Sequence, residues 1–387
     1  MIMIDTGDRI AAKAAQMARP EFIAAYPITP QTVIVEKTAE YTETGELDAE
    51  YMRVESEHSA MTAVIGAAIT GIRTFTATSS HGLALMHEML HWAALSRLPI
   101  VMVNVNRTLG PGWNIWADQT DALAQRDTGW VQLYCSSCQE IFDVIIQAYR
   151  LAEMEDVQLP IMVNYDAFVL SHTSMPVEVP EQAQIDKFLP PYRALWQIDP
   201  DDPLTYANMV PQAHFGGIRK DMQDAHDRVK KLFPQIAGEW KERFGTDHGG
   251  LIEEVHCDDA EYVLVTMGAF GAEAKVAVEQ LRDEGVKVGL ARVRVFRPFP
   301  AEAFWTLASG RTFVVVDRGV SVGSGGGIYT ELKSALYGHS NAPVHGFIAG
   351  LGGKDVTYGE MAQMVRRVAG GHASEVEWWG LDCQGGA

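Results

Sequence analysis

The sequence predicts an α/β protein built on parallel β-sheets with helices on both faces. Short apolar, β-branched segments alternate with helical segments over residues 20–170, and the same alternation resumes from residue 260. A polar, proline-containing stretch and a charged helical pattern lie between them. We therefore expect a doubly wound domain over 1–170, an extended connector and helical arm over 171–257, and a smaller α/β domain over 258–387.

The first region contains five clear strand patterns, each a short apolar run bounded by polar or turn residues. They cover residues 22–28, 73–79, 100–106, 130–135 and 160–168. After the first strand, Thr29 and Pro30 predict a helix start, because threonine is a good N-cap and proline suits the first helical turn. Further helices are expected from Ser56, over the histidine-bearing segment that follows the second strand, and over 139–155.

The middle and last regions differ in pattern. Residues 174–192 are polar and proline-rich, which indicates an extended connector, and 218–245 predict a charged amphipathic helix interrupted at Pro234. Beyond residue 260, apolar strands such as 262–268 again precede helices such as 272–285. A charged helical arm such as 218–245 typically packs against another domain or subunit.

Composition and charge narrow the function classes. The chain has 387 residues, of which 47% are apolar and 21% charged, as in ordinary globular proteins. Its net charge of −19 repels a phosphate backbone, so we expect no nucleic-acid partner. No apolar run approaches the roughly 18 residues of a membrane helix, and the N-terminus lacks an export pattern, so we expect a cytoplasmic protein without a membrane span. Of the four cysteines, Cys135 and Cys138 could form half of a metal site, but ordinary reduced thiols are the favoured interpretation.

The segment HEMLH at positions 87–91 carries the signature of zinc metalloproteases, in which two histidines on one helix face bind the metal. The surrounding residues argue against that function. The extended metalloprotease motif requires glycine at 94 and histidine at 97, where Ala94 and Arg97 stand. The helix also leads directly into an apolar strand. We interpret His87 and His91 as residues of a helix packed in an α/β domain or at a subunit interface.

A glycine cluster, SVGSGGGIYTEL at 321–332, lies between a predicted strand and helix, where phosphate-binding loops occur. The dinucleotide pattern G-x-G-x-x-G fails at Ile328, and Asn341 stands where an acidic residue would be expected. The P-loop lysine and hydroxyl are also missing. We favour tight helix–strand packing or a turn at an interface over a bound phosphate.

Three segments share one expected location, the carboxyl ends of the parallel strands, where ligands bind in open α/β sheets. They are YPITP at 26–30, VESEHSA at 54–60 and VNRTLGPGWNIWADQTD at 105–121. Together they offer the hydroxyl of Thr29, the carboxylate of Glu57 and the cation of Arg107, a set that suits a small anionic substrate. The residues alone leave two readings open, because Arg107 could form a surface ion pair and Glu57 could serve only as a first-turn acid.

Motifs along nearly the whole chain, in order, add a more specific signal. They are YPITPQT, SEHSAMTAVIGAAITG, TSSHGLALMHEMLHW, NRTLGPGWNIWADQTD, AQRDTGWVQLY, VNYDAFVLSHT, VRVFRPFP, DRGVSVGSGGG and IAGLGGKDVT. This set resembles the α subunit of 2-oxoacid:ferredoxin oxidoreductases of the pyruvate synthase type. The resemblance implies a thiamine-diphosphate-binding, pyrimidine-type doubly wound domain over 1–170 and a transketolase C-terminal-like α/β domain over 258–387.

The resemblance also implies roles for particular residues. Glu57 matches the carboxylate that shifts the cofactor's aminopyrimidine to the tautomer that removes the C2 proton. Thr29 and Arg107 match the positions that hold the 2-oxoacid, and arginine suits a carboxylate through a bidentate pair. Pro27, Ile28, Thr29 and Glu57 would border the cofactor. The implied reaction converts the 2-oxoacid to acyl-CoA and CO2, with electrons passed to iron–sulfur clusters.

The chain lacks the GDG motif that holds the Mg²⁺ and diphosphate in thiamine enzymes, and it lacks the cysteines for a [4Fe–4S] cluster. We therefore expect no metal site here and an obligate complex. A β subunit would carry the Mg²⁺/diphosphate site and a cluster, with a γ subunit and a ferredoxin-like δ subunit beside it. A dimer of such heteromers is expected, and a flavin subunit that passes electrons to a nicotinamide is an alternative to ferredoxin.

The substrate stays open between pyruvate-like acids and an aromatic 2-oxoacid such as phenylglyoxylate. Trp113 stands where a smaller residue is usual in the pyruvate members, and its indole could stack on a phenyl ring or pack against a partner subunit. The competing function class is a non-catalytic subunit that keeps the fold for assembly. The joint presence of Glu57, Thr29 and Arg107 argues against that class.

Overall fold

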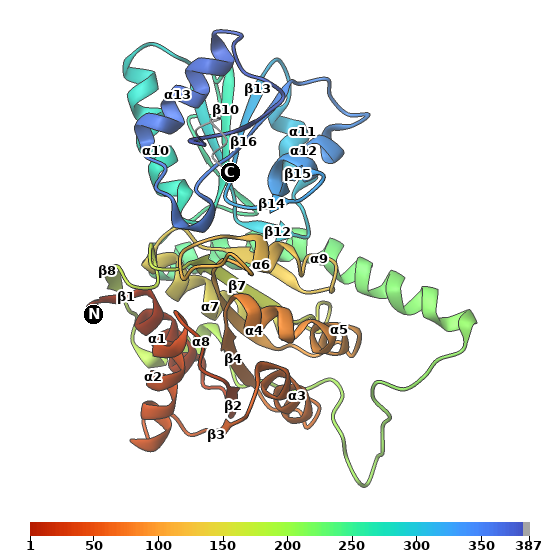
Figure 1. The fold of residues 1–387 in the computed structure, drawn as a ribbon. Helices are drawn as coiled ribbons and strands as arrows, with labels where there is room; N and C mark the ends of the chain where they lie inside the picture. Colours follow the sequence, from red (N-terminus) through yellow and green to blue (C-terminus); the bar gives the residue numbers. More distant parts are fainter. Residues whose placement is uncertain (382–387) are drawn as a thin grey trace.

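The computed structural model describes residues 1–381 and contains two α/β domains, which lie one above the other in Figure 1. The first domain is built on a seven-stranded sheet in the order β12–β6–β7–β5–β4–β2–β3, parallel except for β12. In chain order its strands are β2 (Phe22–Ala25), β3 (Glu50–Arg53), β4 (Thr74–Thr78), β5 (Val101–Asn106), β6 (Val131–Tyr134), β7 (Ile161–Asp166) and β12 (Val295–Arg297). The chain passes from β2 outward to β3 and then returns past β2 to β4, so the sheet has a topological switch between β2 and β4.

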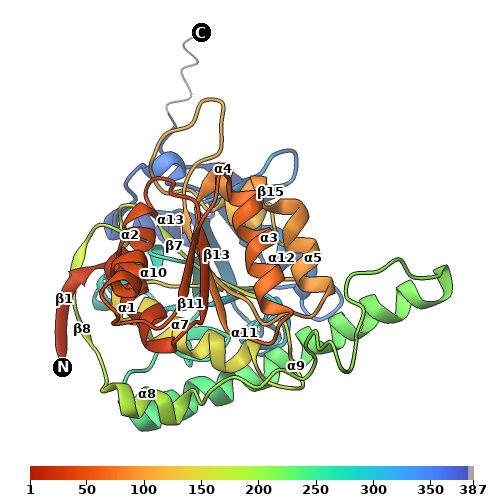
Figure 2. The same ribbon diagram turned by 90° about the horizontal axis from the view of Figure 1, so that it is seen from below.

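Helices cover both faces of this sheet, because its central strands are apolar on both sides. Helices α1, α2 and α7 pack together on one face and α3, α4 and α5 on the other, as Figure 2 shows from below. Their bounds are α1 Gly7–Ala18, α2 Thr32–Glu43, α3 Glu57–Ala68, α4 Ser80–Leu85, α5 His87–Leu95, α6 Thr120–Leu123 and α7 Cys138–Ala152. A two-stranded antiparallel ribbon of β1 (Ile2–Thr6) and β8 (Ser174–Glu178), which the sequence patterns did not predict, lies beside α1.

The predicted helix start at Thr29 is wrong. Thr29 and Pro30 form a turn, and α2 begins at Thr32 with Gln31 as its N-cap. The Gln31 side chain is fully buried and donates hydrogen bonds to the carbonyls of Ala77 (2.6 Å) and Tyr26 (3.2 Å). These bonds tie the turn to β4, so the tertiary contact of Gln31 outweighs the local capping preference of threonine.

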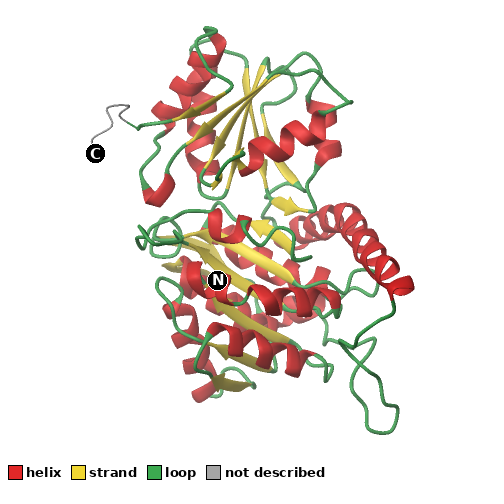
Figure 3. Ribbon diagram, turned by 45° about the vertical axis from the view of Figure 1, so that its right-hand side comes forward, coloured by secondary structure: helices red, strands yellow, loops and turns green. Residues whose placement is uncertain are grey.

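The second domain has a six-stranded sheet in the order β17–β16–β13–β10–β11–β9, parallel except for β9 (Figure 3). The strands are β9 (Ile252–Val255), β10 (Tyr262–Met267), β11 (Val288–Val293), β13 (Thr312–Asp317), β16 (Val344–Ile348) and β17 (Val376–Trp378). Helices α10 (Phe270–Asp283) and α13 (Tyr358–Ala369) pack on one face, and α11 (Ala301–Leu307) and α12 (Gly327–Leu336) pack together elsewhere on the sheet. A small ribbon of β14 (Val320–Ser321) and β15 (Gly325–Gly326) and a 3-10 turn, η1 (Leu351–Gly353), complete the domain. The predicted α/β class with parallel sheets is confirmed.

The segment between the domains contains α8 (Gln182–Phe188), an irregular stretch over 189–211 and the long helix α9 (Gln212–Phe244). In Figure 1 the irregular stretch and the start of α9 project from the body of the molecule. The predicted interruption at Pro234 is wrong, because α9 runs through it. Proline removes one backbone hydrogen bond, but Phe233, Ile236 and Trp240 are buried against the first domain and hold both sides of the helix in place.

The two domains share a buried interface. β12, which follows β11 in the second domain's chain, pairs with β6 of the first sheet, and the second sheet takes in β9 ahead of residue 258. Asp166, at the end of β7, accepts hydrogen bonds from the backbone of Ala269 (2.6 Å) and from the side chain of Gln119 (3.2 Å). One continuous apolar core extends from the first sheet into the second domain. The exact boundaries near 170 and 258 stay a prediction.

In the part of the chain that the structure describes, no helix combines the length and the apolar character that a membrane crossing requires.

Candidate active site

The residues singled out by sequence gather where β2, β4 and β5 end, at the topological switch of the first sheet. Thr29 follows β2, Glu57 begins the helix after β3, and Arg107 follows β5 directly. These positions converge because the carboxyl ends of parallel strands lie along one edge of the sheet. The Arg107 guanidinium donates a hydrogen bond from Nη1 to the backbone carbonyl of Thr29 at 2.5 Å, which joins two of the three segments.

Glu57 is the first residue of α3 and is 6% exposed. The helix starts here because Ser56 is its N-cap, with a side-chain oxygen that accepts the Ser59 N–H at 3.2 Å. The Glu57 carboxylate lies against Gly82 of α4, since a Cβ built on Gly82 would come within 2.5 Å of Glu57 Oε1 and 2.6 Å of Thr78 Oγ1. Only glycine at position 82 leaves room for that carboxylate.

The Glu57 carboxylate and a neighbouring hydroxyl have no hydrogen-bond partners in the described part of the chain. No hydrogen bond to the Glu57 carboxylate is made by residues 1–381, and the buried hydroxyl of Thr78 also has no partner among them. Buried polar groups normally have hydrogen-bond partners, so this pair is suited to a ligand that brings its own donors and acceptors. An aminopyrimidine ring, with a ring nitrogen beside an amino group, has that character.

Arg107 is 4% exposed, and its charge is not neutralised by an ion pair with any described residue. Burial lowers the pKa of Arg107, whereas the negative charges of Asp121 and Glu57 raise it. Its Nε has no hydrogen-bond partner within the described chain, and its guanidinium lies 4.9 Å from the centroid of the Trp113 ring. A buried cation with a free donor is suited to binding a carboxylate.

The remaining predicted residues lie on the turn between β2 and α2. Pro27 and Thr29 are exposed and Ile28 is partly exposed, so all three present surface at the same edge as Glu57 and Arg107. The Thr29 hydroxyl makes no hydrogen bond with another described residue; only its backbone carbonyl contacts Arg107. The structure thus brings all five predicted site residues to one edge of the sheet.

Asp121 organises the backbone beneath this site. Its Oδ2 accepts the N–H groups of Ser80 (3.0 Å) and Arg107 (3.1 Å), and its Oδ1 accepts from Asn106 Nδ2 (2.8 Å) and Ala122 N–H (2.7 Å). Burial raises the pKa of Asp121 and these donors lower it. Burial outweighs the donors, so the pKa is raised to about 6. One carboxylate therefore fixes the start of α4 and the end of β5 relative to each other.

Replacing Asp121 by asparagine is expected to destabilise the chain by about 1–3 kcal/mol, because an amide NH2 would face buried N–H donors that have no other acceptor. Thermal unfolding measures the loss. The control is Asp127→Asn, which removes the same charge from a side chain that is 85% exposed and should change stability by less than about 0.5 kcal/mol. Equal unfolding temperatures for the two variants would contradict the role of Asp121.

The histidines of the zinc-like motif have other contacts. His87 Nδ1 lies 2.5 Å from Gln125 Oε1, and the rings of His87 and His91 meet edge to face at 5.0 Å. No group of three or more histidine, cysteine or acidic side chains with a metal-binding arrangement occurs within residues 1–381. Of the cysteines, Cys135, Cys138 and Cys257 are buried free thiols, and Cys383 lies outside the described residues.

The glycine cluster has a structural explanation. Asp317, at the end of β13, accepts the N–H groups of Ile328 (2.7 Å) and Tyr329 (3.1 Å) at the start of α12. A Cβ on Gly326 would lie 2.0 Å from the Asp317 carboxylate. The protein's own carboxylate thus takes the place at the helix N-terminus that a phosphate would occupy, in agreement with tight helix–strand packing.

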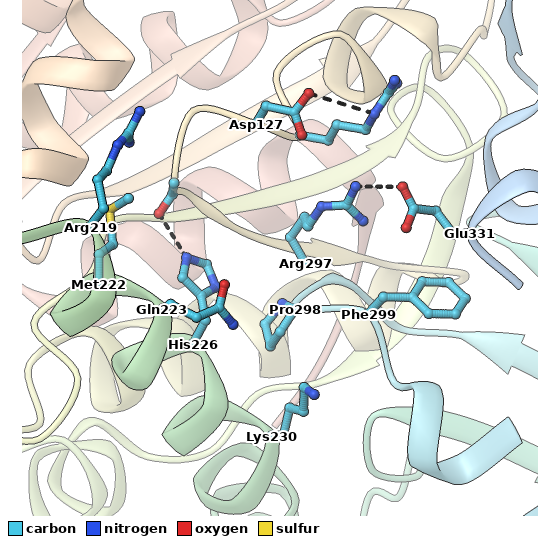
Figure 4. A pocket seen from close by; sticks show the side chains of 12 residues that line it. Asp127, Arg219, Met222, Gln223, His226, Lys230, Arg297, Pro298, Phe299 and Glu331 are labelled. Carbon is cyan, nitrogen blue, oxygen red and sulfur yellow. Dashed lines mark hydrogen bonds and ion pairs between the residues drawn. The ribbon is translucent and has the colours of Figure 1, made fainter. Parts of the chain in front are cut away.

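A separate cleft of about 480 Å³ lies between α9 and the segment that includes β12 (Figure 4). It is lined by several cations, of which Arg297 pairs with Glu331 at 2.6 Å; His226 lies 3.0 Å from the Gly129 carbonyl. None of the predicted site residues lines this cleft. It is therefore distinct from the strand-end site.

Two family models match the chain. Residues 13–237 match the model described as pyruvate flavodoxin/ferredoxin oxidoreductase, thiamine diphosphate-binding, and residues 260–361 match pyruvate:ferredoxin oxidoreductase core domain II. The first match alone covers more than half of the sequence. The chain belongs to the 2-oxoacid:ferredoxin oxidoreductase family, as an α subunit.

Curated relatives extend over the same length. The chain is 47% identical to ketoisovalerate oxidoreductase subunit VorA of Pyrococcus horikoshii, covering 97% of both chains. It is 43% identical to pyruvate synthase subunit PorA of Methanothermobacter thermautotrophicus, covering 98% of both. This family consists of thiamine-diphosphate-dependent 2-oxoacid oxidoreductases that act as parts of complexes, so the predicted enzyme class is confirmed.

Solved structures bear on the fold of this α subunit. The 2-oxoglutarate:ferredoxin oxidoreductase of Magnetococcus marinus superposes with a TM-score of 0.72 at 18% identity, over 95% of this chain and 65% of that one. A split-gene transketolase superposes with a TM-score of 0.58 at 12% identity, over 94% and 97%. The prediction of a thiamine-type domain followed by a transketolase C-terminal-like domain is confirmed.

The sequence interpretation missed Thr78, Ser80, His81, Gly82 and Asp121 as parts of this site. Four of them lie in TSSHG at 78–82, which spans the end of the strand predicted over 73–79 and the start of the helix after it. The same rule that selected Thr29 and Arg107, that ligands bind beyond the carboxyl ends of strands, would have selected this segment.

Proposed function

We propose that this α subunit takes part in the oxidative decarboxylation of a 2-oxoacid to an acyl-CoA. In balanced form the reaction is R–CO–COO⁻ + CoA–SH → R–CO–S–CoA + CO2 + 2 e⁻ + H⁺. The observation that supports it most is the convergence of an unpaired buried carboxylate, Glu57, with an unpaired buried cation, Arg107, at the switch point of a thiamine-type sheet.

Thiamine diphosphate, when bound, supplies the carbon nucleophile and the electron sink for decarboxylation. The residues present fit its pyrimidine end, because Glu57 and Thr78 offer an unsaturated carboxylate and hydroxyl side by side. The carboxyl group of Glu57 would hold and release a proton for the bound pyrimidine. Pro27 and Ile28, on the β2–α2 turn, would border the cofactor. The diphosphate and its Mg²⁺ are assigned to a β subunit, since this sequence has no GDG motif.

Arg107 binds the carboxylate of the 2-oxoacid, and Thr29 lies beside it on the neighbouring turn. The planar guanidinium would bind the planar carboxylate and so fix the orientation of the ketone. Trp113, 52% exposed above the guanidinium, borders the space for the substrate side chain.

Replacing Arg107 by alanine is expected to lower kcat/KM for the 2-oxoacid about 10- to 100-fold, through loss of a charge-assisted hydrogen bond. Lysine at 107 should recover part of the loss, because it keeps the charge without the planar fork. Viologen-dye reduction by the purified complex measures both. The KM for coenzyme A serves as the internal control and should not change; an unchanged KM for the 2-oxoacid would contradict the assignment.

The same assay with a panel of 2-oxoacids identifies the substrate side chain that the enzyme prefers. The relatives are named for ketoisovalerate and pyruvate, which supports an aliphatic acid, whereas the exposed indole of Trp113 also suits an aromatic acid such as phenylglyoxylate. We expect pyruvate-like acids to be the preferred substrates. The panel contains pyruvate, 2-oxoisovalerate and phenylglyoxylate, and the acid with the highest kcat/KM identifies the class.

The partners follow from what this chain lacks. We propose a β subunit with Mg²⁺ and a [4Fe–4S] cluster, a γ subunit and a ferredoxin-like δ subunit, with ferredoxin or, through a flavin subunit, a nicotinamide as acceptor. Genes for such subunits beside this one would support the enzyme. A non-catalytic assembly subunit is the second candidate, and the Glu57 variant described in the Discussion separates the two. A cytoplasmic location and the absence of nucleic acid stay predictions.

A further inference from the structure

His81, the second residue of α4, lies between the ends of β4 and β5, and its role is not explained by the functions assigned so far. Its Nε2 accepts a hydrogen bond from the backbone N–H of Gly110 at 2.9 Å. Because Nε2 accepts, the neutral ring carries its proton on Nδ1, and Ser80 Oγ lies 3.3 Å from that nitrogen. The Ser80 hydroxyl in turn donates to the Thr108 carbonyl. The imidazole therefore joins α4 to the segment after β5 directly through Nε2, and indirectly from Nδ1 through the Ser80 hydroxyl.

That segment, residues 107–113, carries the proposed substrate-binding side chains. Arg107 Nη2 lies 3.3 Å from His81 Nδ1, and because both nitrogens carry protons in this tautomer, the two groups are in contact without a hydrogen bond. The Trp113 ring meets the His81 ring edge to face at 5.8 Å. Trp113 also covers Gly110, where a Cβ would come within 2.4 Å of the indole. His81 thus contacts the guanidinium, the indole and the backbone between them.

Other hydrogen bonds hold the two ends of this segment, and at its start the Arg107 backbone N–H donates to Asp121 (3.1 Å). Thr108 Oγ1 donates to the Asn114 carbonyl (2.6 Å) and accepts its N–H (2.8 Å), and Asn114 Nδ2 donates to Gly352 of the second domain (3.1 Å). No other hydrogen bond to the Gly110 backbone N–H is made in the described chain. Removal of the imidazole would leave the middle of the loop without a polar anchor.

We propose that His81 is a positioning residue, which holds residues 107–113 so that the Arg107 guanidinium faces the edge where Thr29 and Glu57 lie. The inference rests on the proposed function, because it acts through Arg107. A displacement of about 1 Å in a binding group changes rates by up to about 10²-fold, so loss of this anchor is expected to affect the 2-oxoacid more than coenzyme A.

Two substitutions separate the contacts of the ring. In His81→Gln the amide oxygen reaches the position of Nε2 and can still accept from Gly110. In His81→Asn the shorter side chain reaches only the position of Nδ1, so the Gly110 bond is lost. Hydrogen exchange at the Gly110 amide, measured on the assembled complex by mass spectrometry, reports the anchor directly, and dye-reduction kinetics report its consequence.

We expect His81→Asn to speed exchange at Gly110 about tenfold or more and to raise the 2-oxoacid KM about 10- to 100-fold, with the KM for coenzyme A unchanged. His81→Gln should restore both quantities to within a few-fold of the original protein. The control is His345→Asn, a change on a partly exposed second-domain ring that contacts the Ser374 carbonyl at 3.1 Å; it should alter neither.

The outcomes that overturn the inference differ from those that overturn the proposed function. Unchanged Gly110 exchange in His81→Asn, or faster exchange with unchanged KM, refutes positioning by His81. Arg107→Ala, measured in parallel, tests the substrate assignment by itself. If Arg107→Ala leaves the 2-oxoacid KM unchanged, the proposed role of Arg107 fails, whatever the His81 variants show.

Discussion

Replacing Glu57 by glutamine is expected to lower turnover of the assembled complex about 10²- to 10⁴-fold while the complex still forms. Glutamine matches glutamate in size but cannot exchange the proton that general acid–base chemistry requires. The carboxylate makes no hydrogen bond to residues 1–381, and it lies in a space shaped by Gly82. The substitution therefore removes the ability to exchange a proton without removing a hydrogen bond within residues 1–381. Dye reduction with saturating 2-oxoacid and coenzyme A measures the loss.

The matched control is Glu55→Gln. Glu55 lies two residues earlier, is exposed, and hydrogen bonds to the hydroxyl of Ser59 in the first turn of the same helix. The same charge is removed a short distance away, so turnover should stay within about twofold. Thiamine diphosphate content of each complex is determined alongside, so that loss of cofactor is distinguished from loss of proton transfer.

Turnover of Glu57→Gln within tenfold of the original complex would contradict the proposed chemistry. It would favour the second candidate, a subunit that keeps the fold for assembly, because such a subunit has no need of this carboxylate. Low turnover with full cofactor content would exclude that candidate. The experiment thus decides between an enzyme subunit and a scaffold.

The sequence alone was sufficient for the fold class, because the alternation of apolar strands and helices is determined by local patterns. It was also sufficient to place Thr29, Glu57 and Arg107 at one edge, since parallel strands bring their carboxyl ends together regardless of side-chain detail. Local capping rules failed at Thr29, where the buried Gln31 contact with β4 shifted the start of α2. Tertiary packing likewise carried α9 through Pro234.

The network beneath the site could not be predicted from residue types. Asp121 lies in the short helix α6 and Ser80 at the start of α4, and nothing in their spacing shows that they meet through a hydrogen bond of 3.0 Å. The role of Gly82 also depends on the approach of a helix from another strand. Such contacts are set by the packing of α4 against α3 and α6, which single-sequence patterns do not encode.

Replacing Glu140 by glutamine is expected to destabilise the chain by about 3–5 kcal/mol, the largest effect on stability among these predictions. Glu140 lies on α7 of the first domain and is fully buried. Its carboxylate pairs with Arg292 (3.0 Å) and Arg294 (2.6 Å), which come from β11 of the second domain and the residue after it. Glutamine keeps the shape but leaves two buried guanidinium groups without this counter-charge.

The remaining partners compensate only in part. Arg292 keeps Glu253, at 2.6 Å, whereas Arg294 keeps only the backbone carbonyls of Gly249 and Gly250. The matched control is Glu302→Gln, which breaks a different ion pair, that of Lys230 on α9 with Glu302 on α11 at 3.0 Å. That pair is partly exposed, so its loss should change stability by less than about 1 kcal/mol. Comparable unfolding temperatures for the two variants would contradict the prediction that the Glu140 ion pairs contribute more to stability than the Lys230–Glu302 pair.

The pH dependence of the stability lost in Glu140→Gln provides a second test. Burial by itself would raise the pKa of Glu140, but the charges of Arg292 and Arg294 outweigh it and hold that pKa well below its usual range. A carboxylate whose pKa is lowered on folding stabilises the protein fully above the pKa of the unfolded chain, about 4.3, and loses that contribution as pH falls toward the folded value. The stability difference between the original protein and Glu140→Gln should therefore be constant from about pH 5.5 to neutrality and should shrink below about pH 4.3. A difference that grows on acidification would show that Glu140 is protonated in the folded interface, and the ion pairs would then not hold the domains together.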